Sequence, residues 1–540
     1  MIEQWIERAL PQPDRGQVPP FQDARSARDW LKLLPLINVP VAHAELTEAI
    51  SQLNHSDLPA LDALKIIEQF RETVHILQEG MQEKLIGKPV PLTPAEQETW
   101  FAIYSMWLHL EHAYALAWRA ACSGEQTVAE YLPLLAERTL YYTNQAMACQ
   151  VQIYRRPPAR DWQQLFAFYQ LARAQHIDKL KARDSLIQIS GVSTPEAMFL
   201  HALLFAAANP YQYSHKQQLW LHKRLEILAT RSTLAPKAEG LPGRPPLLIN
   251  LAEPGVPLRA DGRGEADELS IDTLSLAQVL SKRIKLLRMG EMPEKIGLGS
   301  ELGPQAAEEL LRELYRAWCD HPLERQLPRR PTDRYLEAGL QLKNLHLWLA
   351  AGHFAPPPQA EQQMSSAELM QIRMFGQTSA RLAPVAPLAP QTQQWQISNE
   401  TAQGMCLRRP RDETQRLVLH QVLMIADGQQ RLIGQIRWLA EQDGEQQLGL
   451  QLLPGTPHAA SIRAQDAARF GQSDFTSVVM IDAVPALKSP ASLLLPPGWF
   501  RQGRLLDYWD GQTMHRIRLV SLLQRGADFE RVHFVGSGGL

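Results

Sequence analysis

The chain is poor in cysteine, and the cysteines it has form no pattern. Only four occur in 540 residues: Cys122, Cys149, Cys319 and Cys406. No two of them make a C-x-x-C pair, and none stands within a cluster of histidines. This scatter argues against a structural zinc site and against a disulfide framework. A chain of this kind suits the reducing cytoplasm.

The sequence also lacks a long apolar run and an excess of charge of either sign. Its longest apolar run, from Ala197 to Ala208, is interrupted by His201 and is too short to span a bilayer. The first residues, Met1 to Trp5, show no basic stretch before an apolar one, so no signal peptide is predicted. The formal net charge is only −2, which predicts no general surface for polyanions. We therefore expect a cytoplasmic protein that does not bind bulk DNA or RNA, in which any nucleotide site is locally basic.

No arrangement of nucleophile, base or metal ligands rises above chance, so the sequence predicts a protein that is not an enzyme and has no cofactor. His109 and His112 share one face of a helix with metal-ligand spacing, but no second pair of ligands stands at matching spacing. We interpret them as structural or partly exposed histidines. The glycine-rich segment 297–303 follows a helix rather than a buried strand, which favours a linker over a nucleotide loop.

What the sequence does have is the composition of a globular protein, with 45% hydrophobic and 21% charged residues over a length that suits about three or four domains. Residues 1–230 read as helices. Thr93 before Pro94 predicts a capped helix over 94–121, and Thr194 before Pro195 predicts another start. One apolar stripe recurs at steps of three and four: Ala63, Ile67, Phe70, Val74, Leu77 and Met81. These features predict an irregular helical array, a type of surface that usually binds protein.

The rest of the chain changes character twice. Residues 231–271 are rich in proline, glycine and charge and predict a linker, with one short strand candidate at 247–251. A helical connector is expected over 272–324. Beyond residue 330, period-two alternation at 336–349, 417–425, 432–439 and 448–453 predicts an antiparallel β-barrel over 325–465. Residues 466–540 are again β-rich, as a second small barrel or an extension of the first. The fold class is therefore α+β and multidomain, with an N-terminal all-helical domain followed by β-structure.

Two short segments carry the residues that are best suited to binding a ligand. Arg330 and Arg334 each offer a planar fork of donors that suits a guanine edge, phosphate oxygens or stacking on a base. Asn399 and Thr401 place an amide and a hydroxyl on one face of a strand, and Gly404 allows a turn or a close backbone approach. Together they predict a site for an anionic ligand that carries a base.

These segments, R-x-x-x-R followed by [DN]-x-[ST]-x-x-G, resemble the motifs of the PilZ-domain family, whose members bind the bacterial second messenger cyclic di-GMP. The resemblance covers roughly residues 325–465. It implies that Arg330 and Arg334 clasp guanine and phosphate, with Arg329 assisting. It also implies that Asn399, Thr401 and Gly404 complete the pocket.

The chain departs from the family pattern in two ways. Thr401 stands where serine is more frequent and Asn399 where aspartate is common, and both keep the hydrogen-bonding capacity. Arg334 and Asn399 are 65 positions apart, far more than usual. A Pro/Ala/Gln-rich insertion at about 355–393 accounts for this spacing, and we expect it to be dispensable for binding. The alternative is that these residues bind no ligand. Arg330 and Arg334 are then solvated charges before a strand, and Asn399 is a residue of an ordinary turn.

The resemblance implies a receptor that couples cyclic di-GMP to a protein partner through the helical domain. The overall plan is similar to that of a receptor of type IV pilus assembly in surface attachment, which also suggests the cell pole as a location. A helical scaffold or adaptor whose PilZ-like barrel no longer binds ligand is the alternative. We expect an arm around Arg330 that is mobile without ligand and folds over it when bound.

Overall fold

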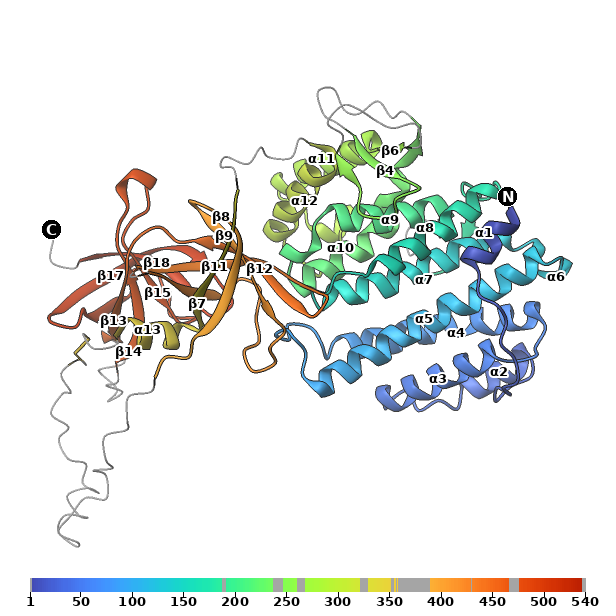
Figure 1. Cartoon of the computed structure of the whole chain (residues 1–540), viewed down its shortest axis with the longest axis horizontal. Coiled ribbons are helices and arrows are strands. Elements are labelled where there is room, and N and C mark those ends of the chain that lie inside the picture. The colour runs from blue at the N-terminus through green and yellow to red at the C-terminus, as the bar shows by residue number, and fades with distance from the viewer. Residues whose placement is uncertain are drawn as a thin grey trace, which may run out of the picture. The chain divides into compact units, whose positions relative to one another are not determined.

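The computed structural model describes residues 2–186, 191–236, 246–259, 268–320, 329–350, 354–355, 357, 389–428, 430–465 and 475–536. The chain divides into two compact units (Figure 1). Met1–Arg325 with Asp412–Arg416 forms the helical unit, and Gln326–Arg411 with Leu417–Leu540 forms the barrel unit. Within the described residues, no helix is both long and apolar enough to cross a membrane.

Twelve α-helices of the described residues make up most of the helical unit. They are α1 Ile2–Ala9, α2 Ala24–Leu31, α3 Val39–Asn54, α4 Ala60–Gln82, α5 Pro94–Cys122, α6 Gln126–Ala129, α7 Leu132–Gln152, α8 Ala159–Ala174, α9 Pro195–Ala207, α10 His215–Leu228, α11 Leu274–Arg288 and α12 Pro304–Cys319. The long helices α5 and α7 pack against each other in the middle of the unit.

The helix starts follow the local sequence. Thr93 caps α5 by accepting from the amide of Glu96 at 3.4 Å, and Glu96 accepts from the amide of Thr93 at 2.9 Å. This reciprocal box satisfies two amides that a helix start would otherwise leave without partners. Thr194 caps α9 by accepting from the amide of Ala197 at 3.0 Å. Both starts agree with the sequence prediction, and five of the six stripe residues of α4 are buried, Ala63 being the partly buried one.

The predicted linker is wrong for the described part of 231–271, which forms a small sheet. Strands β3 Thr233–Ala235, β4 Leu247–Asn250, β5 Leu258–Arg259 and β6 Glu268–Asp272 pair in the order β3-β6-β4-β5. Ile249 and Ile271 are buried in the same core as the helices. The strand candidate at 247–251 is confirmed by β4. The other strands were missed because they are only two to five residues long and stand among prolines and glycines. A two-stranded pair, β1 Ala182–Arg183 with β2 Val192–Ser193, lies between α8 and α9.

The first barrel is closed and antiparallel. Its strands are β7 Arg330–Leu340, β8 Gln393–Thr401, β9 Gly404–Pro410, β10 Val422–Asp427, β11 Gln430–Gln442 and β12 Glu445–Leu452, in the order β10-β11-β12-β9-β8-β7. Asp443 and Gly444 join β11 to β12 with positive φ values of 52° and 78°, the hairpin turn that this dipeptide favours. The insertion predicted at about 355–393 lies largely outside the described residues.

The alternation at 336–349 misleads beyond Leu340, where β7 ends and a helix, α13 Leu342–Ala350, follows. Leu342, Leu345 and Trp348 recur at steps of three and are buried on one face of α13. The same residues fit a strand poorly, since a step of three puts alternate members on opposite faces. The period therefore changes from two to helical within the predicted strand.

The C-terminal β-rich region is a second closed barrel rather than an extension of the first. Its strands are β13 Pro457–Ala464, β14 Thr476–Ile481, β15 Ser492–Leu495, β16 Leu505–Trp509, β17 Met514–Arg525 and β18 Glu530–Gly536, in the order β13-β14-β15-β18-β17-β16. Strand β13 belongs to this barrel, although the sequence analysis placed residues up to 465 in the first. Helices followed by two antiparallel barrels confirm the predicted fold class.

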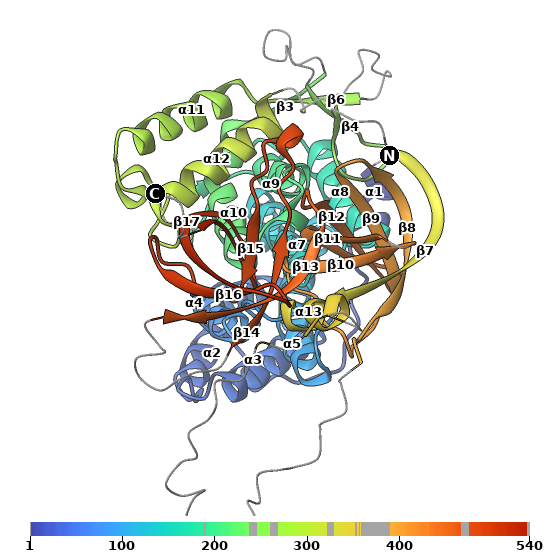
Figure 2. The ribbon, with the colours of Figure 1, turned by 90° about the vertical axis from the view of Figure 1, so that its left-hand side faces the viewer.

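The two barrels share a hydrophobic core. Helix α13, which continues from β7 of the first barrel, packs against β13 and β14 of the second (Figure 2). One buried cluster joins Val422 and Met424 of the first barrel to Leu494 and Phe529 of the second. The amide of Val422 also donates to Asp528 at 2.9 Å. Because burial of apolar surface dominates such contacts, the barrels form one structural unit.

Candidate ligand-binding site

Strand pairing brings the two sequence motifs together at one end of the first barrel. In the pairing of β7 with β8, Arg330 lies opposite Glu400 and Pro331 lies opposite Asn399. The register then shifts, so that Arg334 lies opposite Ile397. A second shift between Ile397 and Asn399 occurs in the pairing of β8 with β9. Such bulges re-aim side chains at a barrel rim. All six predicted site residues thus fall on, or directly before, three neighbouring strands.

Arg334 is engaged by two carboxylates. Its guanidinium donates to both carboxylate oxygens of Asp427, at the end of β10, and Nη2 also donates to Glu400 Oε2 at 2.8 Å. The hydrogen bonds to Asp427, and then those to Glu400, raise the pKa of Arg334 above its already high ordinary value. Its side chain remains 39% exposed. The guanidinium donors of Arg334 that a ligand would use are therefore already bonded to Asp427 and Glu400. The side chain is nevertheless accessible to solvent.

Arg329 and Arg330 are in a different state. Both are exposed, and neither has a hydrogen bond or an ion pair with another described residue. Arg330 stands beside Asn399 and Glu400 in the strand register. Asn399 is half-buried and has no side-chain hydrogen bond within the described part of the chain. Two donor-rich side chains and an amide are thus open to a ligand at this rim.

Thr401 and Gly404 have roles in the backbone. Thr401 accepts from the amide of Gln403 at 3.2 Å and donates to the carbonyl of Gly404 at 3.3 Å, which holds the turn between β8 and β9. A Cβ atom added at Gly404 would lie 2.5 Å from the carbonyl oxygen of Leu450 on β12. Glycine is needed here because the neighbouring strand comes too close for a side chain. Neither residue needs a ligand to explain its presence.

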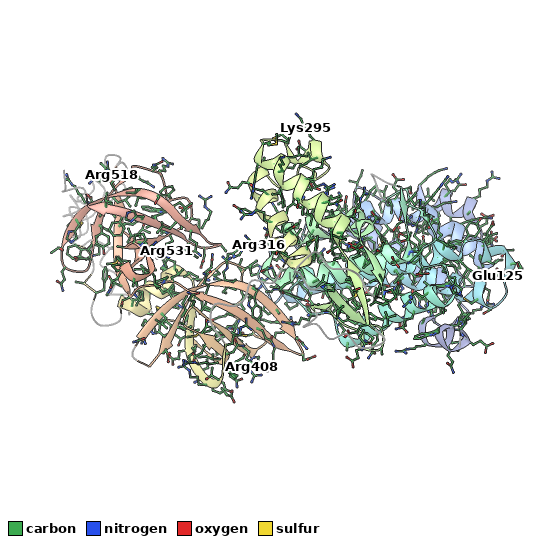
Figure 3. All side chains as sticks on the ribbon, turned by 90° about the horizontal axis from the view of Figure 1, so that it is seen from above. Glu125, Lys295, Arg316, Arg408, Arg518 and Arg531 are labelled. Atoms are coloured by element: carbon green, nitrogen blue, oxygen red, sulfur yellow. The ribbon has the colours of Figure 1, made fainter. Side chains whose placement is uncertain are left out.

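Sequence reasoning missed the two carboxylates. Asp427 stands directly before Gly428, as in an ordinary turn, and Glu400 stands between two motif residues, so neither is conspicuous in the sequence. The available signal was weak, since Asp427 is 93 positions from Arg334 and the pairing requires the closed barrel. Arg409, on β9, was also missed: it is buried, stacks 4.4 Å from the centroid of the Trp395 ring, and donates to Gln446 at 3.0 Å. Arg408, one residue earlier, lies at the surface (Figure 3).

The histidines of α5 lie in a different environment from a metal site. Burial lowers the pKa of His109, and it lowers that of His112 to about 4. His201 on α9 is buried, with Nε2 at 3.0 Å from Nδ1 of His222. In the part of the chain that the structure describes, no group of three or more His, Cys, Asp or Glu side chains could hold a metal ion.

Comparison with protein families decides the identity of the chain. A family model for the N-terminal domain of the cyclic di-GMP receptor FimW matches residues 25–238, and one for the FimW C-terminal β-barrel domain matches residues 461–536. Together they cover more than half of the chain. The chain belongs to the FimW family. A comparison with curated proteins found no match.

The two FimW matches correspond to recognisable parts of the structure. The N-terminal match begins within α2 and ends just beyond β3, so it covers most of the helical array. The C-terminal match begins within β13 and ends with β18, so it covers the second barrel. The predicted site residues of this FimW chain, Arg329 to Gly404, lie between the two matched ranges, on the first barrel.

Proposed function

We propose that this chain binds cyclic di-GMP at the rim of the first barrel and reports the ligand to a protein partner. The observation that carries the proposal is the strand register, which puts Arg330 and Arg334 next to Asn399 across β7 and β8. Membership of a receptor family for this messenger supports it. The pairing of β7 with β8 in the closed barrel brings together motif residues that lie on both sides of a long insertion.

The chemistry of the rim suits the ligand. Cyclic di-GMP offers two guanine edges and two phosphates, and arginine forks bind both by paired hydrogen bonds. Arg330 is free to make such a contact among the described residues, and Arg329 stands beside it. Arg334 contributes by exchanging Asp427 or Glu400 for the ligand. Asn399 supplies an amide to the opposite side, whereas Thr401 and Gly404 shape the strand that carries it.

The response begins at Arg334. An anionic ligand competes with Asp427 and Glu400 for one guanidinium, and any shift of β7 passes into α13, which packs on the second barrel. Ligand changes this equilibrium only by its differential affinity for the two arrangements. The arm thus responds as a paired strand that changes its ion pairs, and not as an irregular segment that folds from disorder. We propose that the helical unit presents the response to a partner in type IV pilus assembly, in the cytoplasm and at the cell pole.

Calorimetric titration of the full chain with cyclic di-GMP, with GTP as the control ligand, tests the proposal. We expect binding of cyclic di-GMP alone, and loss of most of the affinity in Arg330→Ala. A chain that is folded by circular dichroism and binds neither nucleotide would contradict it.

The occupied fork of Arg334 favours a second candidate, a scaffold whose first barrel docks a protein and binds no nucleotide. In that case Asp427 and Glu400 are permanent partners of Arg334, and the barrel is stable without ligand. The same titration separates the two candidates, because the scaffold shows no heat with cyclic di-GMP at any concentration that keeps the protein monodisperse.

A further inference from the structure

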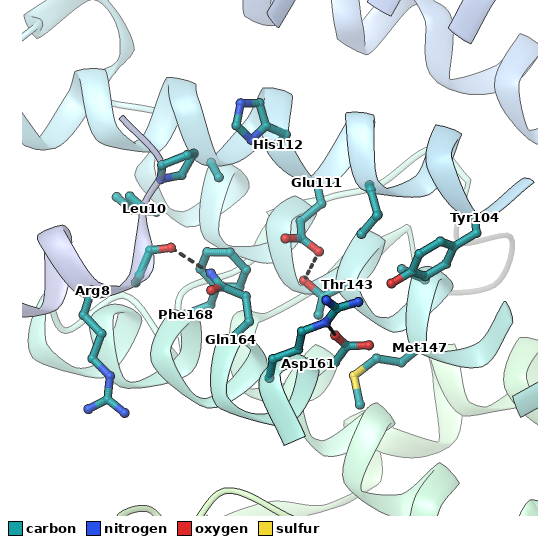
Figure 4. A pocket seen from close by; sticks show the side chains of 16 residues that line it. Arg8, Leu10, Tyr104, Glu111, His112, Thr143, Met147, Asp161, Gln164 and Phe168 are labelled. Carbon is teal, nitrogen blue, oxygen red and sulfur yellow. Dashed lines mark hydrogen bonds and ion pairs between the residues drawn. The ribbon is translucent and has the colours of Figure 1, made fainter. Parts of the chain in front are cut away.

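The helical unit contains a cavity of about 550 Å³ that the ligand chemistry of the barrel does not use. It lies between α1, α5, α7 and α8 (Figure 4). Much of its wall is apolar, from residues such as Leu10, Met147 and Phe168, and Glu111 of α5 extends into it towards Thr143 of α7. A volume of this size holds a small ligand or a long side chain of a partner.

Thr143 is the hydrogen-bond partner of Glu111 in the cavity wall. Its Oγ1 donates to Glu111 Oε2 at 3.1 Å and also lies 2.8 Å from the carbonyl oxygen of Thr139, which competes for the same proton. Because a hydroxyl has one proton, Thr143 offers the Glu111 carboxyl at most one hydrogen bond. It brings no positive charge to balance the carboxylate.

Burial disfavours the charged form of Glu111 and raises its pKa to about 7. The hydrogen bond from Thr143 opposes this rise, and the nearby Asp161 adds to it. No described residue forms an ion pair with Glu111, whereas Asp161 accepts from Gln150 and has the Arg160 Nε at 3.4 Å. Ionised Glu111 therefore has no counter-ion among the described residues, whereas Asp161 has Arg160.

The other charged and titratable groups that line the cavity are Arg8 from α1, Tyr104 and His112 from α5, and Asp161 and Arg160 from α8, while α7 contributes Thr143, Ala146 and Met147. Burial raises the pKa of Tyr104 to about 12 and lowers that of His112 to about 4, so both are neutral at neutral pH. The Arg8 guanidinium lies over the Trp5 ring, 5.4 Å from its centroid. Burial also raises the pKa of Asp161, which unlike Glu111 has an arginine, Arg160, beside it. Glu111 is the cavity carboxyl whose pKa lies near 7 and that has no ion-pair partner among the described residues.

We propose that this cavity binds the cationic end of a ligand, an alkylammonium or a guanidinium, with the Glu111 carboxylate as its counter-ion. Entry of the cation costs Glu111 its proton, which passes to the buffer, so one cation is exchanged for one proton. The rings of Tyr104 and Phe168 supply faces that attract a cation. This site is separate from the barrel rim and does not depend on nucleotide binding.

Calorimetry of the full chain with spermidine and with N-acetyl-arginine amide tests the proposal. We expect one of the two to bind, with a heat at pH 7 that differs between phosphate and Tris buffers because a proton is released. Binding of spermidine alone identifies a free polyamine, and binding of the arginine amide alone identifies a side chain of a protein partner. Binding of neither probe would overturn the proposal.

Two variants make the test specific. Glu111→Gln keeps the shape of the side chain but cannot ionise, and we expect it to weaken the binding probe at least tenfold and to abolish the buffer dependence. Glu98→Gln, an exposed glutamate on the same helix, removes the same charge and should leave both unchanged. Unchanged binding in Glu111→Gln would overturn the proposal.

The parent chain supplies a measurement that needs no variant. Because the cation competes with a proton whose pKa is about 7, the affinity should rise about tenfold between pH 6 and pH 8 for a probe that stays charged throughout. The arginine amide meets that condition. An affinity that is constant or falls over this range would contradict the role of Glu111.

Discussion

Arg334 and Asp427, 93 positions apart, form a two-pronged ion pair across the rim of the first barrel. Both side chains are about one-third exposed, so the pair is partly screened by water. It holds in place the arginine that the proposed ligand needs, and it must be exchanged for that ligand. The free energy of this ion pair therefore reduces the affinity for the proposed ligand.

Replacing Asp427 by asparagine should tighten the binding of cyclic di-GMP. A partly exposed ion pair is worth about 0.2–1 kcal/mol, so its removal should improve affinity by up to about fivefold. Asparagine tolerates the same turn before Gly428, which keeps the hairpin intact. Titration calorimetry of the variant and the parent at equal salt measures the change. Weaker binding by a folded variant would show that Asp427 positions Arg334 for the ligand instead of competing with it.

Arg330→Ala should weaken binding about five- to 150-fold, because a paired arginine contact to a base is worth roughly 1–3 kcal/mol. Arg518→Ala is the matched control: it removes the same charge from an exposed position on β17 of the second barrel (Figure 3). Its effect should be within twofold at physiological salt, where charges beyond about 10 Å are screened. Equal losses in the two variants would indicate general electrostatics and no specific pocket.

Gly404→Ala should destabilise the barrel unit, because the new Cβ would lie 2.5 Å from a backbone oxygen of β12 that cannot move aside without disturbing the strand. Overpacking of this kind costs roughly 1–3 kcal/mol. Gly536→Ala, at the end of β18, meets no atom within 4 Å and serves as control. Thermal unfolding followed by circular dichroism should show a lower midpoint for the first variant alone; equal midpoints would mean that the strands separate easily.

Glu111→Gln should stabilise the helical unit at high pH more than at low pH. The pKa of Glu111 is raised by burial from 4.5 to about 7. The folded state therefore binds an extra proton between these values, and the cost of burying the carboxylate is fully present above pH 7 and is relieved as pH falls towards 4.5. Denaturant unfolding at pH 8 and pH 5 should show a gain of about 1–3 kcal/mol for the variant at pH 8, with a smaller gain at pH 5. The same gain at both pH values would place the pKa of Glu111 outside this range.

The sequence predicts those features that depend on local chemistry. Thr93 and Glu96 satisfy amides within one helical turn, so the start of α5 could be located. Asp443-Gly444 specifies a hairpin by itself. For the helix start and the hairpin, the deciding interaction involves residues close in sequence. The motif residues on β7 and β8 are far apart, with 65 positions between Arg334 and Asn399, and could be associated because together they suit one ligand and resemble the motifs of one family.

Features that depend on tertiary closure could not be predicted. The partners of Arg334 come from β8 and β10, and only the closed barrel brings them to one guanidinium. Strands β3 and β6 are too short for a periodic signal, and their buried apolar residues belong to the core of the helices. The hydrogen bond from Thr143 to Glu111 depends on two helices whose contact no local pattern reveals.

The core shared by the barrels affects how mutant alleles of this chain should be interpreted. Phe529 and Asp528 lie in the range that matches the FimW C-terminal domain, yet they support Val422 and its strand in the barrel proposed to bind the messenger. A substitution at either residue would affect the rim of the first barrel through packing. A signalling defect mapped to residues 528–529 is therefore no evidence that the C-terminal barrel has a separate task, and a complementation test with an intact first barrel is needed before one is assigned.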